Sequence, residues 1–496
     1  MRLLAVLAAL LAAAAAHAAP IGYDGARHLL DRTGFGATDR EVREYAVLDR
    51  AAAVDRLLSG ARREAVTPAP AFATAPFAPF RRLKDMDPEA RKAYQRTLVQ
   101  QGLELRAWWI GEMLATPSPL TERMTLFWHN HFATSQRKVR LAQLMYRQNV
   151  LLRREALGNF AALLHGIAKD PAMLIWLDNA GSRRQAPNEN FAREVMELFT
   201  LGVGHYTESD VKEAARAFTG LSLDRDTGEY RYRPFFHDAG GKTVLGRTGN
   251  YDGDDVLDIL LARPETARFV AQKVWREFVS PTPEAAVVER WAALFRGARY
   301  EIKPLMRAVL TSDAFWDPDN RGTLVKSPVD VVVGTLRTFD IHPSDLRPAA
   351  VQVAVLGQNL FAPPNVKGWP GGDAWIDSAT LLGRKQFVER VFRGSEGMGA
   401  ASAMAEPEAT MAQAAGPVGA GAGPGANASM QRMMNRGLGS YAFNPQRWTH
   451  SLAEGESARD LEHLVLAAAP VNAIPADADA VERVRALVAD PAYQLR

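Results

Sequence analysis

The spacing of hydrophobic residues along most of the chain is that of helices. Between about residues 24 and 212, apolar side chains recur at intervals of three and four, which places them on one face of a helix. The same spacing returns over 254–315 and 328–339. Near residues 221–246 apolar and polar residues alternate instead, as they do in a β-hairpin. The pattern therefore predicts a mainly α protein, a large multi-helix globular body with a small inserted β-hairpin or sheet.

Composition divides the chain into four parts. Residues 1–18 combine an early Arg2, an apolar stretch and Ala16-His17-Ala18, which is typical of a secretory signal peptide. Residues 19–393 are predicted to form the main helical domain with its β insert. Residues 394–440, rich in Ala, Gly, Met and Ser, are expected to be a disordered low-complexity insert. Residues 441–496 are expected to supply C-terminal helices that pack back on the main domain.

We expect a periplasmic or secreted protein, since no later apolar segment is long enough for a transmembrane span once the signal is cleaved. The 496 residues include 59 Lys plus Arg and 56 Asp plus Glu, for a net charge of +3. Charge so nearly balanced does not favour nucleic acid as a partner. The absence of cysteine excludes disulfides, thiolate metal sites and cysteine nucleophiles.

The segment Phe127–Phe132 carries two histidines, His129 and His131, separated by one residue. If the backbone is extended there, both imidazoles face the same way and can share a metal ion. If the segment is helical, the two side chains point in different directions, and His131 faces the core. We treat His129 as a candidate catalytic residue and His131 as a candidate metal ligand. The alternative for His131 is a buried neutral histidine with a hydrogen-bonded ring nitrogen.

An acidic helix is predicted to begin after Asn188, a natural N-cap. On this helix Asn190, Glu194 and Glu197 share one stripe, with Arg193 on its flank. Three outcomes stay open: oxygen ligation of a divalent metal ion, a general acid–base pair, or neutralisation by Arg193 on a solvated face. We take Glu194 and Glu197 as candidate catalytic residues. Asn190 is a candidate metal ligand, and Arg193 a candidate substrate-binding residue.

Three other segments contribute candidates. Asp178 ends an apolar segment just before the acidic helix, and His237 lies beside Asp238 on a predicted turn; both are candidate metal ligands. Trp369 and Trp375 lie in or just beyond a loop rich in Pro and Gly. Their indoles are candidates for stacking on sugar rings, with burial in the core as the alternative.

Long motifs in these segments resemble those of an exported bacterial family, domain of unknown function 1800. The resemblance rests on His28 to Gly36 and on "LTERMTLFWHNHFATS", "DPAMLIWLDN", "NENFAREVMELFTLGVGHYTE" and "PPNVKGWPGG". It implies export, and it implies a sulfatase-like partner protein, which such proteins tend to have encoded beside them. It carries over no activity and no catalytic residues.

Two functions fit these residues. The first is a metal-dependent hydrolase of an envelope or extracellular polymer, in which carboxylates and a histidine hold a divalent metal ion that activates water. The second is a non-catalytic envelope or extracellular binding or assembly protein, whose polar motifs form a structural ion-pair network. The first is favoured if Glu194, Glu197 and a histidine converge around an open space that solvent can reach. The second is favoured if Arg193 or another cation fills that space.

Overall fold

The computed structural model describes residues 19–76, 86–393, 441, 443–452 and 458–496. The predicted signal peptide, 1–18, and the predicted low-complexity insert, 394–440, therefore lie outside the described residues. None of the helices in the described ranges is both long and apolar enough to cross a membrane.

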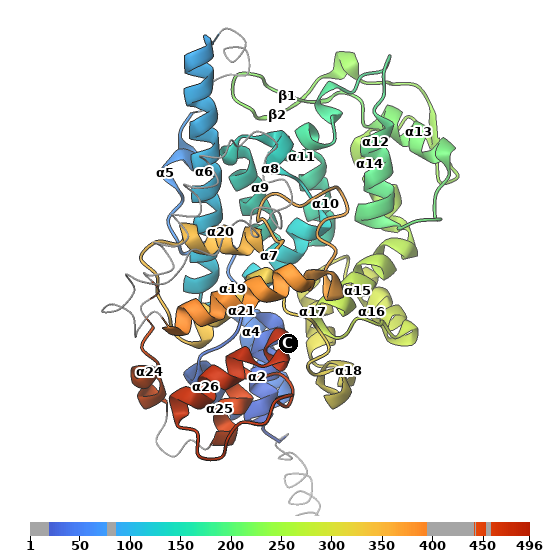
Figure 1. The fold of residues 1–496 in the computed structure, drawn as a ribbon. Helices are drawn as coiled ribbons and strands as arrows, with labels where there is room; N and C mark the ends of the chain where they lie inside the picture. The colour runs from blue at the N-terminus through green and yellow to red at the C-terminus, as the bar shows by residue number, and fades with distance from the viewer. Residues whose placement is uncertain (1–18, 77–85, 394–440, 442, 453–457) are drawn as a thin grey trace, which may run out of the picture.

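Helices dominate the described chain, which confirms the mainly α prediction (Figure 1). The first half contains α2 (Gly22–Thr33), α3 (Asp39–Ala46), α4 (Arg50–Ser59), α5 (Ala71–Thr74), α6 (Pro88–Ala115), α7 (Pro119–His131), α8 (Gln136–Val139), α9 (Ala142–Arg154), α10 (Phe160–Ala168), α11 (Pro171–Trp176), η1 (Asn179–Gly181), α12 (Glu189–Glu194), η2 (Val195–Thr200) and α13 (Glu208–Ala217).

The second half is also built mainly of helices. It contains α14 (Gly253–Ala262), α15 (Pro264–Phe278), α16 (Ala285–Gly297), α17 (Ile302–Leu310), α18 (Asp313–Trp316), η4 (Pro318–Asn320), α19 (Pro328–Thr338), α20 (Arg347–Val355), η5 (Gly372–Trp375), α21 (Ser378–Arg393), α24 (Pro445–Ser451), α25 (Ala458–Val465), α26 (Ala480–Ala489) and η6 (Pro491–Gln494). In Figure 1 the last helices, in red, lie beside the blue helix α2, and α25 contacts α2.

The β structure lies where the alternating pattern predicts it, as two small antiparallel sheets. Strand β1 (Leu221–Leu223) pairs with β2 (Tyr230–Tyr232), with Ser222 opposite Arg231. After the short η3 (Pro234–Phe236), β3 (Lys242–Val244) pairs with β4 (Arg247–Gly249). The two hairpins form separate sheets.

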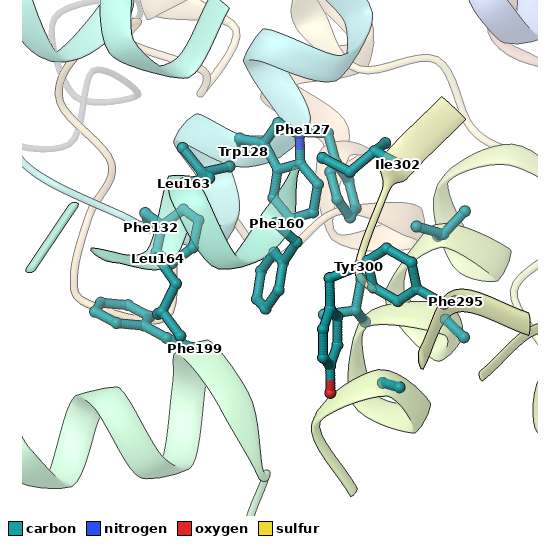
Figure 2. Packing of buried hydrophobic residues seen from close by; sticks show 14 of the residues in the cluster. Phe127, Trp128, Phe132, Phe160, Leu163, Leu164, Phe199, Phe295, Tyr300 and Ile302 are labelled. Carbon is teal, nitrogen blue, oxygen red and sulfur yellow. The ribbon is translucent and has the colours of Figure 1, made fainter. Parts of the chain in front are cut away.

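Helix α7 lies in the middle of the core (Figure 1). Almost every residue from Leu120 to His131 is buried. Its Trp128 stacks near Phe160 of α10, with ring centroids 5.5 Å apart. Phe132, just past the helix, packs against Phe199 at 5.1 Å. Figure 2 shows these aromatic rings gathered from α7, α10 and η2, together with Phe295 and Tyr300. The polar residues at the end of α7 are thus held within an aromatic core.

Buried charges on α7 are paired. Glu122 and Arg153 of α9 each have 1% of the side chain exposed, and Glu122 Oε1 lies 2.6 Å from Arg153 Nε. Trp109 Nε1 donates a further hydrogen bond of 2.8 Å to Glu122. Arg123 pairs with the buried Asp330 of α19. These pairs tie α6, α7, α9 and α19 together.

Candidate functional site

The two histidines of α7 lie in different environments because the segment is helical. His129 is 1% exposed, and its ring packs against Trp109, Phe361 and Trp369 with centroids 5.5 to 5.6 Å away. Burial lowers the pKa of His129 to about 3, so the imidazole is neutral. Its Nε2 has no hydrogen-bond partner among the described residues. A ring enclosed by aromatic groups is shielded from solvent, so its burial does not favour the catalytic role predicted for His129.

Both ring nitrogens of His131 are occupied. Nε2 donates to the carbonyl of Phe199 at 3.1 Å, which leaves Nδ1 to accept from Lys273 Nζ at 3.0 Å. Burial, and then the charge of Lys273, hold the pKa of His131 well below its usual value. Metal ligation by His131 would require one of these hydrogen bonds to break. The alternative expected from the sequence, a buried neutral histidine with a hydrogen-bonded ring nitrogen, matches the contacts of His131.

The predicted metal ligands do not assemble. Within the described ranges, no three histidine or acidic side chains lie together in an arrangement that could hold a metal ion. Asp178 pairs with Lys138 at 2.6 Å and is largely exposed. His237 Nδ1 lies 3.1 Å from the carbonyl of Thr219, and Asn190 is exposed near the start of α12. The physical reason is that these residues come from separate loops and helix faces, and Asp178, His131 and His237 each contact a different group.

The acidic helix is not regular throughout. Asn188 caps α12 as predicted, with its Oδ1 accepting from the backbone N–H of Asn190 at 3.0 Å. The helix then widens into η2, one turn of π-helix. Leu201 N accordingly donates to the carbonyl of Met196, five residues earlier, at 2.8 Å. Such single wide turns are frequent at functional sites.

The carbonyls at the end of η2 are held by side chains. Lys273 Nζ lies 3.3 Å from the carbonyl of Leu198, and His131 donates to that of Phe199. Carbonyls at a helix end lack partners within the helix, so these two side chains satisfy them. Burial, and then the charge of Arg276, lower the pKa of Lys273 to about 8.

Glu194 and Glu197 lie close enough to interact. Burial, and then the charge of Glu197, raise the pKa of Glu194, while Lys367 and Arg193 act in the opposite direction. None of the residues that the structure describes forms a hydrogen bond or ion pair with the half-buried Glu194. Glu197 Oε2 accepts a hydrogen bond of 2.5 Å from the hydroxyl of Tyr206. The two carboxyl groups therefore have unequal environments.

Arg193 does not fill the space between the carboxyl groups. It makes two hydrogen bonds to Glu208, of 2.6 and 2.7 Å. Because the guanidinium is held by Glu208, the predicted substrate-binding role of Arg193 has no direct support in this arrangement. The charge of Arg193 lowers the pKa of Glu194, but its hydrogen bonds go to Glu208 and not to either carboxyl group of the pair.

The loop 361–372 brings a different cation to the site. Gly368 packs directly on Asn130 of α7, whose Oδ1 accepts from Trp369 N at 2.7 Å. This contact places the exposed Lys367 near enough for its charge to lower the pKa of Glu194. The site also includes Lys367, Tyr206 and Asn130, which the spacing of polar residues did not single out. All three lie within the motifs that carry the family resemblance.

The tryptophans of this region are buried. Trp369 is 4% exposed and Trp375 is 7% exposed, and both belong to the hydrophobic core. Their faces are covered by neighbours, such as His129 on Trp369. Their burial favours the alternative expected from the sequence, packing in the core, over stacking on sugar rings.

Comparison with known proteins gives one result. Residues 28–495 match the family model described as protein of unknown function (DUF1800). Searches of curated proteins and of solved structures found no match. Because the match spans nearly the whole chain and includes the segments that form the carboxyl site, the chain belongs to the DUF1800 family of proteins of unknown function.

Proposed function

We propose that the chain is an exported hydrolase of an envelope or extracellular polymer, in which Glu194 is the general acid and Glu197 the general base. The observation that carries the proposal is the unequal pair of carboxyl groups: Glu194 is half-buried, unpaired and raised in pKa, whereas Glu197 is oriented by Tyr206. Pairs of titratable groups with opposed environments are the usual arrangement for acid–base catalysis.

Tyr206 supports the assignment of Glu197 as the base. Burial, and then its hydrogen bond to Glu197, raise the pKa of Tyr206 to about 12, so the phenol keeps its proton and donates it. Glu197 is therefore the hydrogen-bond acceptor at this oxygen. A second carboxylate nearby is disfavoured by repulsion, which favours the protonated form of Glu194.

In the proposed reaction Glu194 donates a proton and Glu197 accepts one. The carboxylate of Glu197 takes a proton from water as the water oxygen attacks the polymer, and Glu194 gives its proton to the leaving oxygen. The net reaction adds one water across one bond. Lys367 supplies positive charge beside the pair. The divalent metal ion expected from the sequence has no assembled ligand set in the described residues, so the proposal rests on the carboxyl groups.

Export is supported by the composition of residues 1–18, which resembles a cleaved signal, and by the family resemblance. An exported protein meets envelope and extracellular polymers, so these are the substrates to test. Material collected outside the cytoplasm is expected to begin at Ala19.

The test is hydrolysis by the full chain of isolated cell-wall glycan and of extracellular polysaccharide, measured as new reducing ends. We expect Glu194→Gln and Glu197→Gln each to lose about 10²–10⁴-fold in rate. Glu189→Gln is the matched control, because Glu189 is exposed on the same helix and its contacts do not include the pair. Thermal unfolding of each variant separates lost chemistry from lost folding. A wild-type chain that leaves both polymers intact, or a Glu194→Gln variant with full rate, would refute the proposal.

The second candidate, a non-catalytic binding or assembly protein, is favoured by the buried ion pairs. Glu122–Arg153 and Arg123–Asp330 lie in or beside the same motifs, and they show that several charged motif residues serve the fold. If the polymers stay intact, the next measurement is binding of the full chain to a sulfatase-like protein, a partner that the resemblance alone implies. Binding would support this second candidate.

A further inference from the structure

A polar pocket lies where the first and last described segments meet, and it shares no residue with the carboxyl site. It is partly open to solvent, and the space within it that the centre of a water molecule can occupy is about 20 Å³. Its walls come from α2, α19, α25 and η6, in the region of Figure 1 where red and blue helices adjoin. The residues that line it are Asp31, Gly36, Lys326, Asp330, Gly334, Thr338, Leu464, Val465, Tyr493 and Arg496.

The two acidic side chains of the pocket are already neutralised. Asp31 pairs with Arg27, one helical turn earlier on α2. Asp330 pairs with Arg123, and Arg123 and Arg496 together hold the pKa of Asp330 far below its usual value. These carboxylates therefore present little free negative charge to the pocket.

Lys326 makes no direct ion pair with a carboxylate among the described residues, although Asp31 and Asp330 lie near enough to act on its pKa. Its Nζ lies 3.9 Å from the ring centroid of Tyr493, and it forms no hydrogen bond or ion pair within the described ranges. Burial lowers the pKa of Lys326 to about 8, although Asp31 and Asp330 act in the opposite direction. An unpaired ammonium in a partly enclosed site is unfavourable unless an anion accompanies it.

Arg496 adds hydrogen-bond donors at the same pocket. Its side chain is 8% exposed, and its Nη2 donates to Glu277 Oε1 at 2.8 Å. Its Nε lies 3.5 Å from Asp330 Oδ2, whereas its Nη1 is buried and has no hydrogen-bond partner in the described part of the chain. Buried donors of a guanidinium are normally satisfied. Nη1 lacks a partner although the side chain lines the pocket.

Two further arginines increase the positive charge around the pocket. Arg32 is fully buried and donates to the carbonyls of Phe278, Val279 and Asn320. Arg384, also fully buried, donates to the carbonyls of Lys326 and Trp375 and to Gln494 Oε1. Among the described residues neither has a carboxylate at hydrogen-bond distance. Carbonyls satisfy donors but do not cancel charge, so an excess of positive charge is left in a buried region.

We propose that this pocket binds a small tetrahedral oxyanion, phosphate or sulfate, through Lys326 Nζ and the unpartnered Nη1 of Arg496. A lysine ammonium supplies a point charge and the guanidinium nitrogen supplies a charged donor, and an oxyanion has acceptors for both. The bound anion joins α19 to the last described residues, so it closes the C-terminal segment onto the body. The inference does not depend on the proposed hydrolase.

The first test is thermal unfolding of the full chain in a buffer free of phosphate and sulfate, with each anion then added at matched ionic strength. A ligand that binds only the folded state raises its stability in proportion to the logarithm of its concentration. We expect a rise in Tm on the order of a few degrees that grows with the logarithm of the phosphate or sulfate concentration, and none with chloride. An equal rise with chloride would mean general screening and would overturn the proposal.

The variant Lys326→Met should abolish the anion-dependent rise. Lys303→Met is the matched control, because it removes the same charge from an exposed position on α17 and should keep the full rise. A full rise in Lys326→Met would overturn the proposal.

A measurement on the wild-type chain covers the case in which Lys326→Met does not fold. Lysines are acylated with an amine-specific reagent at pH 8 and quantified by mass spectrometry, with and without saturating phosphate or sulfate. We expect the anion to slow modification of Lys326 several-fold and to leave Lys303 unchanged. Equal modification of Lys326 in both conditions would overturn the proposal. So would a Lys326 that stays unmodified without anion, since it would then be unreachable from solvent.

Discussion

Replacing Gly368 by alanine tests whether the contact between loop 361–372 and α7 holds the site together. Gly368 has φ of +83°, a left-handed conformation that favours glycine. A Cβ at this position would lie 2.6 Å from the backbone carbonyl oxygen of Asn130 and closer still to its side-chain oxygen. The carbonyl belongs to the last turn of a buried helix and has no room to move, so the loop must shift instead.

The expected cost has two parts. A non-glycine residue in the left-handed region costs about 1–2 kcal/mol. Displacing the loop also breaks the 2.7 Å hydrogen bond from Trp369 N to Asn130 Oδ1 and leaves partly buried polar groups unsatisfied, for about 1–3 kcal/mol more. Together they predict that Gly368→Ala lowers the free energy of unfolding by about 2–5 kcal/mol.

The assay is urea unfolding of the full chain followed by circular dichroism, with Gly372→Ala as the control. Gly372 also has a positive φ, +56°, but a Cβ there meets nothing within 4 Å. The control should therefore lose only the conformational part, about 1–2 kcal/mol. If the two variants lose equal stability, the close approach to Asn130 carries no energy and the reasoning is refuted. Polymer hydrolysis, where present, should fall in Gly368→Ala because Lys367 moves with the loop.

The remaining predictions concern two buried acids. Glu122→Gln should lower the free energy of unfolding by about 3–5 kcal/mol in urea titration, because it leaves Arg153 buried without its carboxylate. The double variant Glu122→Leu/Arg153→Met removes both charges and should lose less stability. Equal losses in the two variants would contradict this prediction. Burial raises the pKa of Asp170 to about 7, against hydrogen bonds from Met173 N–H and Gln148 Nε2, while the unfolded value is about 3.9. Between these two pKa values the folded state binds more protons at Asp170 than the unfolded state does. The free energy of unfolding should therefore fall as pH rises from about 4 to about 7. Asp170→Asn should flatten that fall in urea midpoints measured across the range, and an unchanged slope would count against the raised pKa.

Local signals in the sequence were enough to predict much of the fold. Three- and four-residue spacing predicted the helices, alternation predicted strands near 221–246, and Asn188 caps the acidic helix as expected. Each of these features depends on neighbours within a few residues. The alternating pattern did not show that β3–β4 forms a sheet separate from the first hairpin. The domain boundaries at 18, 393 and 440 stay predictions.

The site was harder to predict because its contacts join distant segments. Local spacing selected Glu194 and Glu197, but it assumed a regular helix and could not show the wide turn η2. Lys367 reaches Glu194 from 173 positions further along the chain, and Tyr206 reaches Glu197 only because the chain turns back after η2. Local spacing likewise could not show the contacts of the histidines. His131, for example, contacts Lys273, which comes from a distant part of the sequence, and no group of metal ligands assembles among the described residues.

Two consecutive residues of α7 explain why a polar motif lies inside an aromatic core. Asn130 holds the loop that carries Lys367, through the hydrogen bond to Trp369 N. His131 holds the wide turn that carries Glu197, through the carbonyl of Phe199, and it is itself fixed by Lys273. The two halves of the carboxyl site are therefore attached to one rigid, buried helix end. A site anchored in this way is preorganised without a metal ligand at either position, so the polarity of this motif is explained by positioning.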